Sequence, residues 1–377
     1  MCDAHCPEVD EKGAHPPALF AAYPRLAQHI GHVSLGTFPT AIERIPGLLP
    51  GGCELWVKRE DRAGVRYGGN KVRKLEFLLA HAKAQRAQRL LTLGGVGSNH
   101  VLATALYGAA LGMQVDAVLF PQPLSDPARP YIRQNLHAGL ASGLRPHVCR
   151  ATGALAWTLP WAYLSLSFDA TRTGQPVQYI PGGGSNALGT LGWWSGGLEI
   201  AQQIAAGAAP PFDALYLALG SGSTTAGLLL GLGQACREVV AVRVVPWPLA
   251  TRLAVQRLLV SARKHVARVL DARPPTTRVP ALRIETSFLG SGYGFSTEAS
   301  QQALQHAADR GLRLDPTYTA KAFAALWADD QAGRLRGKRV LFLHTYSGQP
   351  LCTPGDPTLA LASLPRWLAD PLNPWTW

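Results

Sequence analysis

Two lysines, Lys71 and Lys74, follow the turn sequence Gly68-Gly69-Asn70 at the start of a predicted helix. The glycines permit a tight turn, and asparagine is common at a helix N-terminus. Lysines three residues apart lie on one helix face and can serve one ligand. A lysine that loses hydration against an apolar helix becomes a better nucleophile, suited to a Schiff base with an aldehyde, while a second cation suits a phosphate. Taken alone, the stretch favours two solvated lysines on an exposed helix.

A second candidate site begins at Gly220, between an apolar strand predicted at 214–219 and a helix predicted at 226–232. Backbone N–H groups at a helix start, with hydroxyls beside them, form a phosphate cradle. The sequence is not a Walker motif, and it also lacks the third glycine of a dinucleotide site. A merely tight turn is the alternative. The run of small and hydroxyl residues favours phosphate binding by Ser221, Gly222, Ser223, Thr224 and Thr225.

Ser98, Asn99 and His100 occupy the equivalent position after the strand predicted at 89–93. Their backbone N–H groups can bind a carboxylate, and the side chains of Ser98 and Asn99 can reach a ring oxygen or a proton in transfer. Simple helix capping is the alternative. His100, taken alone, suits a structural role better than a catalytic one. A dinucleotide site is not indicated, because Asp116 opens the next strand instead of ending it.

Three tyrosines and a threonine complete the candidates. Tyr293 and Tyr318 stand in loops rich in glycine and proline, where a tyrosine usually packs on the surface. Thr345 and Tyr346 follow the strand predicted at 339–344. Ligands of α/β folds bind at the carboxyl edge of the sheet, so Thr345 is placed to offer a hydroxyl there.

Strands and helices alternate along the chain. The predicted strands are 55–59, 89–93, 115–120, 145–149, 214–219, 241–245 and 339–344. The predicted helices are the one after Lys71, 101–111, 128–141, one ending at 204, 226–232, 250–270 and 297–309. Alternation of this kind predicts an α/β fold with open, twisted, mostly parallel sheets flanked by helices. A chain of 377 residues is long enough for two domains.

Composition narrows the class of protein. Hydrophobic residues make up 47% of the chain and charged residues 16%, so a large core is expected. The net charge of +12 is scattered, which argues against a nucleic-acid surface and favours anionic small ligands. No long uncharged apolar stretch predicts a membrane span. Six cysteines fit a reducing compartment, and a cytoplasmic location is predicted.

The two ends of the chain carry unusual compositions. Cys2 and Cys6 lie near His5 and His15, but no second cysteine pair supports zinc, so no metal site is predicted. We interpret this stretch as a loose tail. The tryptophan-bearing segment after Cys352 is rich in proline and is predicted to pack on the surface.

Together these segments resemble the 1-aminocyclopropane-1-carboxylate deaminase/D-cysteine desulfhydrase family of pyridoxal-phosphate enzymes, which has the tryptophan-synthase-β-like fold (fold type II). The resemblance runs in order from about Pro39 to Pro350. Its most specific parts are Lys-Arg-Glu-Asp at 58–61 and Gly-Gly-Asn-Lys-x-Arg-Lys-Leu-Glu at 68–76. Further support comes from Ser-Asn-His at 98–100, the 220–225 loop, Asp-Pro-x-Tyr at 315–318 and His-Thr at 344–345.

The resemblance implies pyridoxal 5'-phosphate as cofactor, bound to Lys71 as a Schiff base. It implies that the phosphate is held by Lys74 and residues 221–225 and that Asn99 hydrogen-bonds the ring hydroxyl oxygen. The implied catalytic residues are Lys71, Ser98, Tyr293 and Tyr318. The implied cofactor contacts are Lys71, Lys74, Asn99, Ser221, Gly222, Ser223, Thr224, Thr225 and Thr345. The implied substrate contacts are Ser98, Asn99, His100, Tyr293, Tyr318 and Tyr346.

The resemblance also implies how the chain is divided. Residues 1–76 and 183–377 are expected to form a large cofactor-binding domain. Residues 77–182 are expected to form a smaller inserted α/β domain that closes over the cofactor. Homodimers are usual in the family, and the substrate is a small amino acid.

One difference separates the two activities named in the family. The deaminase pattern has Glu after the second tyrosine and Leu after the late histidine, whereas this chain has Thr319 and Thr345, similar to the desulfhydrase pattern. A neutral hydroxyl near the pyridine nitrogen gives a weaker electron sink, which suffices for β-elimination of a thiol. The implied reaction is a lyase reaction on D-cysteine that yields an oxo acid, ammonia and sulfide. Ring-opening deamination, racemisation, biosynthetic β-replacement and cofactor binding without turnover remain alternatives.

Two departures from the family pattern lie near the expected substrate. Gly97 replaces the glutamine usual before Ser-Asn, and Tyr346-Ser347 replaces a Gly-Gly pair. The sequence therefore predicts an intact cofactor site with an altered substrate pocket.

Overall fold

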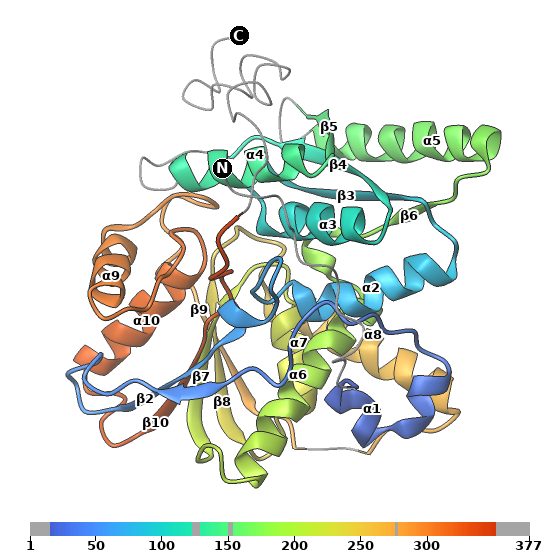
Figure 1. Cartoon of the computed structure of the whole chain (residues 1–377). Helices are drawn as coiled ribbons and strands as arrows, with labels where there is room; N and C mark the ends of the chain where they lie inside the picture. Colours follow the sequence, from blue (N-terminus) through green and yellow to red (C-terminus); the bar gives the residue numbers. More distant parts are fainter. Residues whose placement is uncertain (1–15, 123–128, 150–153, 276–277, 352–377) are drawn as a thin grey trace.

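The computed structural model describes residues 16–122, 129–149, 154–275 and 278–351 (Figure 1). The two predicted tails, with Cys2 and Cys6 at one end and the tryptophan-bearing segment after Cys352 at the other, lie outside the described residues.

The described chain alternates between strands and helices as predicted. The strands are β1 (Ile42–Arg44), β2 (Glu54–Lys58), β3 (Arg89–Gly95), β4 (Gln114–Phe120), β5 (Arg145–Val148), β6 (Val177–Tyr179), β7 (Phe212–Leu219), β8 (Cys236–Arg243), β9 (Ala281–Glu285) and β10 (Arg339–Leu343). The α-helices are α1 (Ala18–Ala22), α2 (Val72–Ala84), α3 (Asn99–Ala110), α4 (Arg129–Ala141), α5 (Leu155–Thr173), α6 (Ala187–Ala205), α7 (Ser223–Gly231), α8 (Arg252–Leu270), α9 (Glu298–Ala308) and α10 (Thr319–Gln331). Short 3₁₀ helices lie at Pro24–Gln28, Glu60–Arg62 and Gly182–Gly184.

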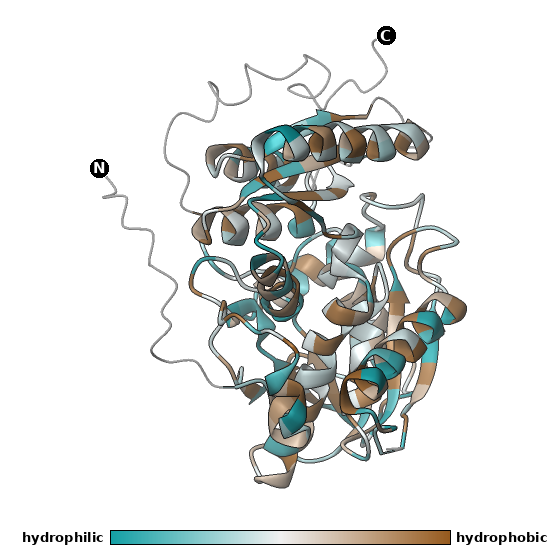
Figure 2. Ribbon diagram, turned by 90° about the vertical axis from the view of Figure 1, so that its right-hand side faces the viewer, coloured by the Kyte–Doolittle hydropathy of each residue, from teal (hydrophilic) through white to brown (hydrophobic). Residues whose placement is uncertain are grey.

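The strands form two sheets, which confirms the predicted α/β class with mostly parallel strands. The larger sheet has the order β1-β2-β10-β7-β8-β9, and only its β1–β2 pair is antiparallel among the described pairs. The smaller sheet has the order β5-β4-β3-β6 and is parallel throughout. The smaller sheet lies above the larger one in Figure 1 and again after a quarter turn in Figure 2.

Strand β7 shows why helices cover both faces of the larger sheet. Its side chains alternate between the faces because a strand has a period of two residues. Leu215, Leu217 and Leu219 join the core with α6 and α7. Ala214 and Tyr216 join the opposite core with α10. A strand buried on both faces reads as a continuous apolar run, as 214–219 does.

The smaller sheet is also covered on both faces. On one side, Leu90 and Leu119 pack in the core formed with α2, α3 and α4. On the other side, Leu91 and Val118 pack against Ala162 of α5. Among the described residues, no helix is long and apolar enough to cross a membrane.

Several elements were not predicted. Helix α5 contains Pro160, which removes one helical hydrogen bond and obscures the pattern in the sequence. Strands β6 and β9 have three and five residues and are only partly buried, so neither gives a long apolar run. Helices α1 and α10 were also missed.

Candidate active site

A cavity of about 700 Å³ opens where the carboxyl ends of strands from both sheets meet. This edge is where α/β sheets bind ligands. Twelve of the predicted site residues line the cavity: Lys71, Lys74, Ser98, Asn99, His100, Ser221, Gly222, Thr224, Thr225, Tyr293, Tyr318 and Thr345. Ser223 and Tyr346 are not among its lining residues.

Lys71 stands at the N-terminus of α2, where the chain makes the predicted glycine turn. Gly69 has φ +81°, and a Cβ on it would lie 2.5 Å from the carbonyl oxygen of Thr345, so only glycine fits there. The Lys71 Nζ donates a hydrogen bond of 2.8 Å to Asn70 Oδ1. Burial lowers the pKa of Lys71 to about 8, and the charge of Asp315 limits the decrease. A substantial fraction of the amine is therefore neutral and nucleophilic near neutral pH.

Lys74 is buried, with 2% of its surface exposed, so the alternative of an exposed helix lysine is wrong. Its Nζ donates a 3.1 Å hydrogen bond to the carbonyl oxygen of Gly183. Burial and the like charge of Lys71 hold the pKa of Lys74 well below its usual value. A bound anion beside this Nζ would offset both penalties.

The 220–225 loop turns into α7 through Gly222, which has φ +92°. Gly222, Thr224 and Thr225, at the start of α7, line the cavity, and the first N–H groups of a helix have no partner within it. The Thr225 Oγ1 is buried and has no hydrogen-bond partner among the described residues. The Asn70 Nδ2 donates a 3.1 Å hydrogen bond to Thr224 Oγ1, which ties this loop to the Lys71 turn.

Ser185 is a neighbour of this loop that the sequence analysis missed. Its Oγ lies 2.6 Å from the Oγ of Ser221 and 2.8 Å from that of Ser223. This contact accounts for Ser223, which is fully buried behind the loop instead of facing the cavity. A serine directly after three glycines was the available signal in the sequence.

These groups fit the phosphate of a pyridoxal cofactor. A buried ammonium at Lys74, an unpartnered buried hydroxyl at Thr225 and a helix N-terminus after Gly222 face one end of one cavity. A phosphate dianion supplies the negative charge and the acceptor oxygens that this set of donors needs.

Ser98 caps α3, because its Oγ accepts hydrogen bonds from the N–H groups of His100 (3.2 Å) and Val101 (3.4 Å). Capping uses the oxygen and leaves the hydroxyl hydrogen free to be donated. Capping and a role in the cavity are therefore compatible.

Asn99 is oriented by two neighbours that the sequence analysis did not identify. Its Oδ1 accepts hydrogen bonds from Tyr67 Oη (3.0 Å) and Asn135 Nδ2 (2.9 Å). With Oδ1 engaged on both sides, the Asn99 Nδ2 is the amide atom available to the cavity. It would donate to an acceptor such as a ring oxygen.

His100 is held in a structural position. Its Nε2 lies 3.0 Å from Thr92 Oγ1. Burial and the charges of Lys71 and Lys74 hold the pKa of His100 well below its usual value, so the ring is neutral. These contacts agree with the structural interpretation of His100.

Tyr293 and Tyr318 face the cavity together instead of packing on the surface. Their hydroxyl oxygens are 2.5 Å apart. Burial raises the pKa of Tyr293 to about 12 and, with the neighbouring Tyr293, raises that of Tyr318 well above its usual value. Both hydroxyls therefore keep their protons; one donates to the other, and the second is left to donate to a ligand. The Asp315 carboxylate positions Tyr318 by accepting its backbone N–H at 2.7 Å.

The departures from the family pattern at Gly97 and Tyr346 have local structural reasons. A Cβ at Gly97 would lie 2.7 Å from Ile132, so α4 excludes a side chain there. The amide of Gln122 fills this region, since its Oε1 accepts the Gly97 N–H at 2.9 Å and its side chain hydrogen-bonds Tyr293. Tyr346 instead packs near Tyr131, with ring centroids 5.9 Å apart.

Of the two threonines in the desulfhydrase pattern, Thr345 alone borders the cavity. The Thr319 Oγ1 donates a 2.6 Å hydrogen bond to Asp315 Oδ2. Thr319, the first residue of α10, therefore contacts Asp315, which itself lines the cavity.

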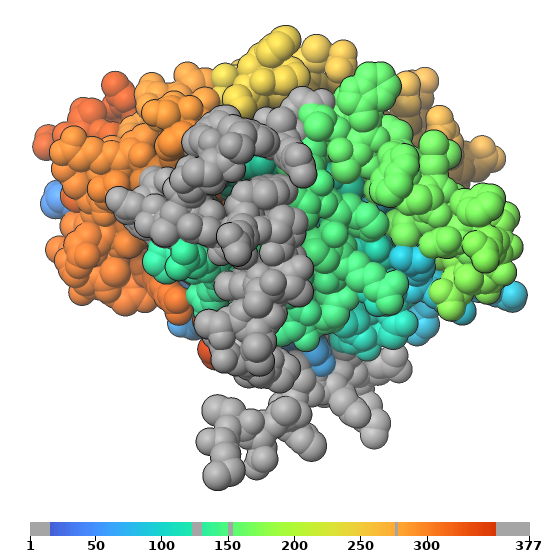
Figure 3. Space-filling view, turned by 90° about the horizontal axis from the view of Figure 1, so that it is seen from above, coloured from blue at the N-terminus to red at the C-terminus, as the bar shows by residue number. Residues whose placement is uncertain are grey.

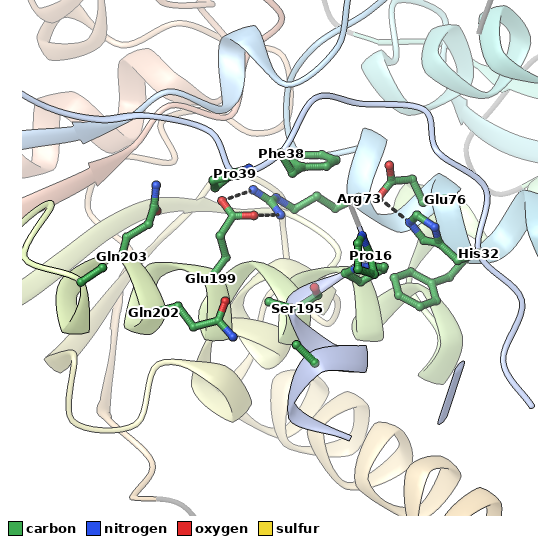
Figure 4. A pocket seen from close by; sticks show the side chains of 16 residues that line it. Pro16, His32, Phe38, Pro39, Arg73, Glu76, Ser195, Glu199, Gln202 and Gln203 are labelled. Carbon is green, nitrogen blue, oxygen red and sulfur yellow. Dashed lines mark hydrogen bonds and ion pairs between the residues drawn. The ribbon is translucent and has the colours of Figure 1, made fainter. Parts of the chain in front are cut away.

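A buried ionic cluster lies on the other side of α2 (Figure 4). The Arg73 guanidinium donates to both carboxylate oxygens of Glu60 and of Glu199 at 2.7–2.9 Å. The Lys58 Nζ also contacts Glu199, at 2.5 Å. The cluster joins β2, α2 and α6 and so supports the helix that carries Lys71 and Lys74.

Comparisons with known proteins agree with this geometry. Residues 33–345 match the family described as pyridoxal-phosphate dependent enzyme. The chain is 32% identical to the bifunctional D-cysteine desulfhydrase/1-aminocyclopropane-1-carboxylate deaminase, mitochondrial, of Arabidopsis thaliana, over 89% of this chain and 82% of that protein. It is 33% identical to a D-cysteine desulfhydrase of Klebsiella pneumoniae strain 342, over 81% of this chain and 91% of that protein.

Solved structures show the same relationship. An ACC deaminase homologue superposes with a TM-score of 0.71 and 29% identity, covering 88% of this chain and 95% of that one. A threonine deaminase from Solanum lycopersicum, at 16% identity and a TM-score of 0.55, shares the fold. The predicted fold type and cofactor are confirmed, and the chain belongs to the family of pyridoxal-phosphate dependent enzymes.

Proposed function

We propose that this enzyme is a lyase that eliminates the β-substituent of D-cysteine or a related amino acid, giving an oxo acid, ammonia and a thiol or sulfide. The observation that carries the proposal is the cavity itself. It joins Lys71, with its lowered pKa, to a phosphate-binding end at Lys74 and to the proton-donating pair Tyr293 and Tyr318. Relatives named D-cysteine desulfhydrase support the choice of substrate.

The proposed cofactor contacts are the residues at the cavity's polar end. Lys74, Ser221, Gly222, Thr224 and Thr225 would hold the phosphate, with Ser223 supporting the loop from behind. The Asn99 Nδ2 would donate to the ring hydroxyl oxygen, and Thr345 would present a neutral hydroxyl near the ring nitrogen. Bound there, pyridoxal phosphate supplies an electron sink for the α-carbon of an amino acid.

The remaining residues would bind the substrate and move protons. The N–H groups at the start of α3, near Ser98 and Asn99, would bind the carboxylate. The Lys71 Nζ, neutral above about pH 8, would remove the α-proton. The hydroxyl of Tyr293 or Tyr318 would donate a proton to the departing sulfur. His100 would support the start of α3, and Tyr346 would act only through its packing.

A panel of substrates tests the proposal. D-cysteine, L-cysteine and 1-aminocyclopropane-1-carboxylate are incubated with the holoenzyme, and oxo acid, ammonia and sulfide are measured. We expect equal amounts of pyruvate and sulfide from D-cysteine. If oxo acid forms from 1-aminocyclopropane-1-carboxylate and not from either cysteine, the result would instead favour deamination. Deamination is the second candidate because the Arabidopsis relative is named as bifunctional. Loss of optical activity without pyruvate would indicate racemisation.

Replacing Lys74 by methionine is expected to weaken binding of pyridoxal phosphate roughly 10- to 100-fold, because a charged hydrogen bond of about 1.5–3 kcal/mol is lost. Equilibrium titration of the cofactor-free protein, followed by absorbance, measures the change. Lys83→Met on the exposed side of the same helix is the matched control and should bind normally. Equal affinities for the two variants would contradict the phosphate role of Lys74.

We also propose a two-domain organisation, with 1–76 and 183–377 as the large domain and 77–182 as the small one. The two sheets support it, and the cavity lies between them. Helix α2 runs across the boundary at 76/77 and would link the two parts. A cytoplasmic location is supported by the thiols of Cys53 and Cys236, which are free cysteines.

We propose a homodimer that uses the outer face of α5, which lies on the surface seen in Figure 3. Trp157, Trp161, Leu164 and Phe168 follow a helical spacing and are 65–80% exposed. At ~150–250 Å² per large aromatic side chain, the stripe offers roughly 500 Å² per subunit. Two such stripes together would reach the ~1,000 Å² expected of a specific interface.

Trp161→Glu is expected to convert the dimer to a monomer, because a buried carboxylate without a partner would weaken association about 30-fold or more. Light scattering after size exclusion measures the mass. Val260→Glu, an exposed apolar position on α8, is the control and should leave the mass unchanged. A monomeric wild-type protein, or a dimeric Trp161→Glu variant, would contradict this interface.

A further inference from the structure

The cavity has an apolar wall that none of the proposed steps uses. Phe120, Leu155, Val245, Leu249 and Phe295 all line it. They come from both sheets, since Phe120 ends β4 and Leu155 begins α5, while Val245 and Leu249 follow β8. The wall therefore faces the same space from two sides.

The wall starts beside the reacting groups. Phe295 lies two residues after Tyr293, and Phe120 lies two residues before Gln122, whose side chain hydrogen-bonds Tyr293. The tyrosine hydroxyls mark where the β-substituent of the substrate would depart. A substituent on the sulfur would thus point along the apolar wall.

The wall contains both packed and solvent-exposed side chains. Phe120 and Leu155 pack against one apolar cluster of the small sheet. Leu249, on the opposite side, is 61% exposed although it lines the cavity. The thiol of cysteine is too small to cover these five apolar side chains. An exposed apolar wall inside a site is stabilised when an apolar ligand group covers it.

The size of the cavity agrees. Its volume of about 700 Å³, which the cofactor and the substrate would share, lies in the upper half of the ~300–1,000 Å³ range of ligand pockets. Polar groups that would hold the cofactor and the substrate carboxylate line the cavity together with this apolar wall. The rest of the space is lined mainly by carbon.

We propose that the preferred substrates are cysteine S-conjugates, amino acids whose sulfur carries an apolar alkyl or aryl group. The inference rests on the proposed lyase function and specifies its substrate class. The Cα–H and Cβ–S bonds break, a carbon–carbon double bond forms, and the sulfur leaves with a proton as the free thiol. The released aminoacrylate reacts with water to give pyruvate and ammonia, so atoms and electrons balance without an oxidant or reductant.

The test compares S-benzyl-D-cysteine with D-cysteine on the holoenzyme, measuring pyruvate and the thiol. We expect kcat/KM to be about tenfold or more higher for the conjugate, mainly through a lower KM, as burial of the apolar ring predicts. Leu249→Asn should reduce this preference roughly three- to tenfold. Leu253→Asn, an equally exposed leucine at the start of α8 that does not line the cavity, is the control and should leave it within about twofold.

Three outcomes would overturn the inference. A higher kcat/KM for D-cysteine would show that the wall does not select the substrate, while leaving the lyase function intact. A preference for the conjugate that Leu249→Asn and Leu253→Asn change equally would show that another part of the cavity is responsible. Absence of pyruvate from both substrates, with cofactor bound, would refute the lyase function and this inference with it.

Discussion

Lys71→Ala is expected to lower kcat by at least about 10³-fold, because the variant loses both the amine that holds the cofactor covalently and the group that moves the α-proton. The absorbance of covalently bound pyridoxal phosphate should disappear, while non-covalent binding through the Lys74 end of the cavity should remain detectable. Spectroscopy and sulfide release on the same sample measure both effects. Lys83→Ala on the same helix is the control. Persistence of the covalent absorbance in Lys71→Ala would contradict the assignment.

The lowered pKa of Lys71 predicts a pH dependence for cofactor capture by the cofactor-free enzyme. The neutral amine reacts, and its fraction rises as the pH approaches about 8. The rate should therefore increase about tenfold per pH unit well below 8 and level off above it, instead of rising to the usual lysine range near 10.4. Stopped-flow absorbance across pH 6 to 10 gives the midpoint. A midpoint near 10 would show that burial does not lower this pKa.

Arg73→Met is expected to destabilise the fold by about 3–5 kcal/mol, because removing one partner leaves buried carboxylates without a counter-charge. The Arg73 guanidinium pairs with Glu60 and with Glu199, the second pair being drawn in Figure 4, and all three side chains are at least 92% unexposed. Burial would raise the pKa of Glu199, but Arg73 and Lys58 outweigh it, so its net pKa is lowered. Urea unfolding monitored by fluorescence measures the free energy of unfolding.

An exposed ion pair provides the control for Arg73. Arg44→Met removes a partner of Glu54 at the surface, where such pairs contribute about 0–1 kcal/mol. A second variant, Arg73→Met with Glu199→Gln, should lose less than the sum of the single losses, since neutralising one carboxylate relieves part of the unpaired charge. A loss below 1 kcal/mol in Arg73→Met would show that the cluster does not support α2.

The cofactor-binding end could be predicted because its signals are local. The glycine turn before Lys71 and the small residues from Gly220 to Thr225 are short stretches in which residue type dictates backbone shape. Their order along the chain, with Ser98 between them, identified the family. The backbone shape of such stretches depends mainly on their own residues. The apolar run 214–219 predicted strand β7 for the same reason.

Contacts between distant segments were beyond prediction. The orientation of Asn99 depends on Asn135, and the support of Ser221 depends on Ser185, each 36 residues away. The stretch around Lys74, taken alone, favours the surface, and packing of α2 against α6 places Lys74 in the interior. Tyr346 was expected at the substrate and instead lies against Tyr131.

The sequence by itself predicted the fold class from its alternating strands and helices, and the resemblance of its motifs to a known family predicted the cofactor and the residues proposed to bind it. Only the tertiary structure decided the pKa of Lys71, the pairing of Tyr293 with Tyr318 and the apolar wall at Leu249. Dehydration and charge proximity are properties of three-dimensional packing, and chain segments far apart in sequence create them together.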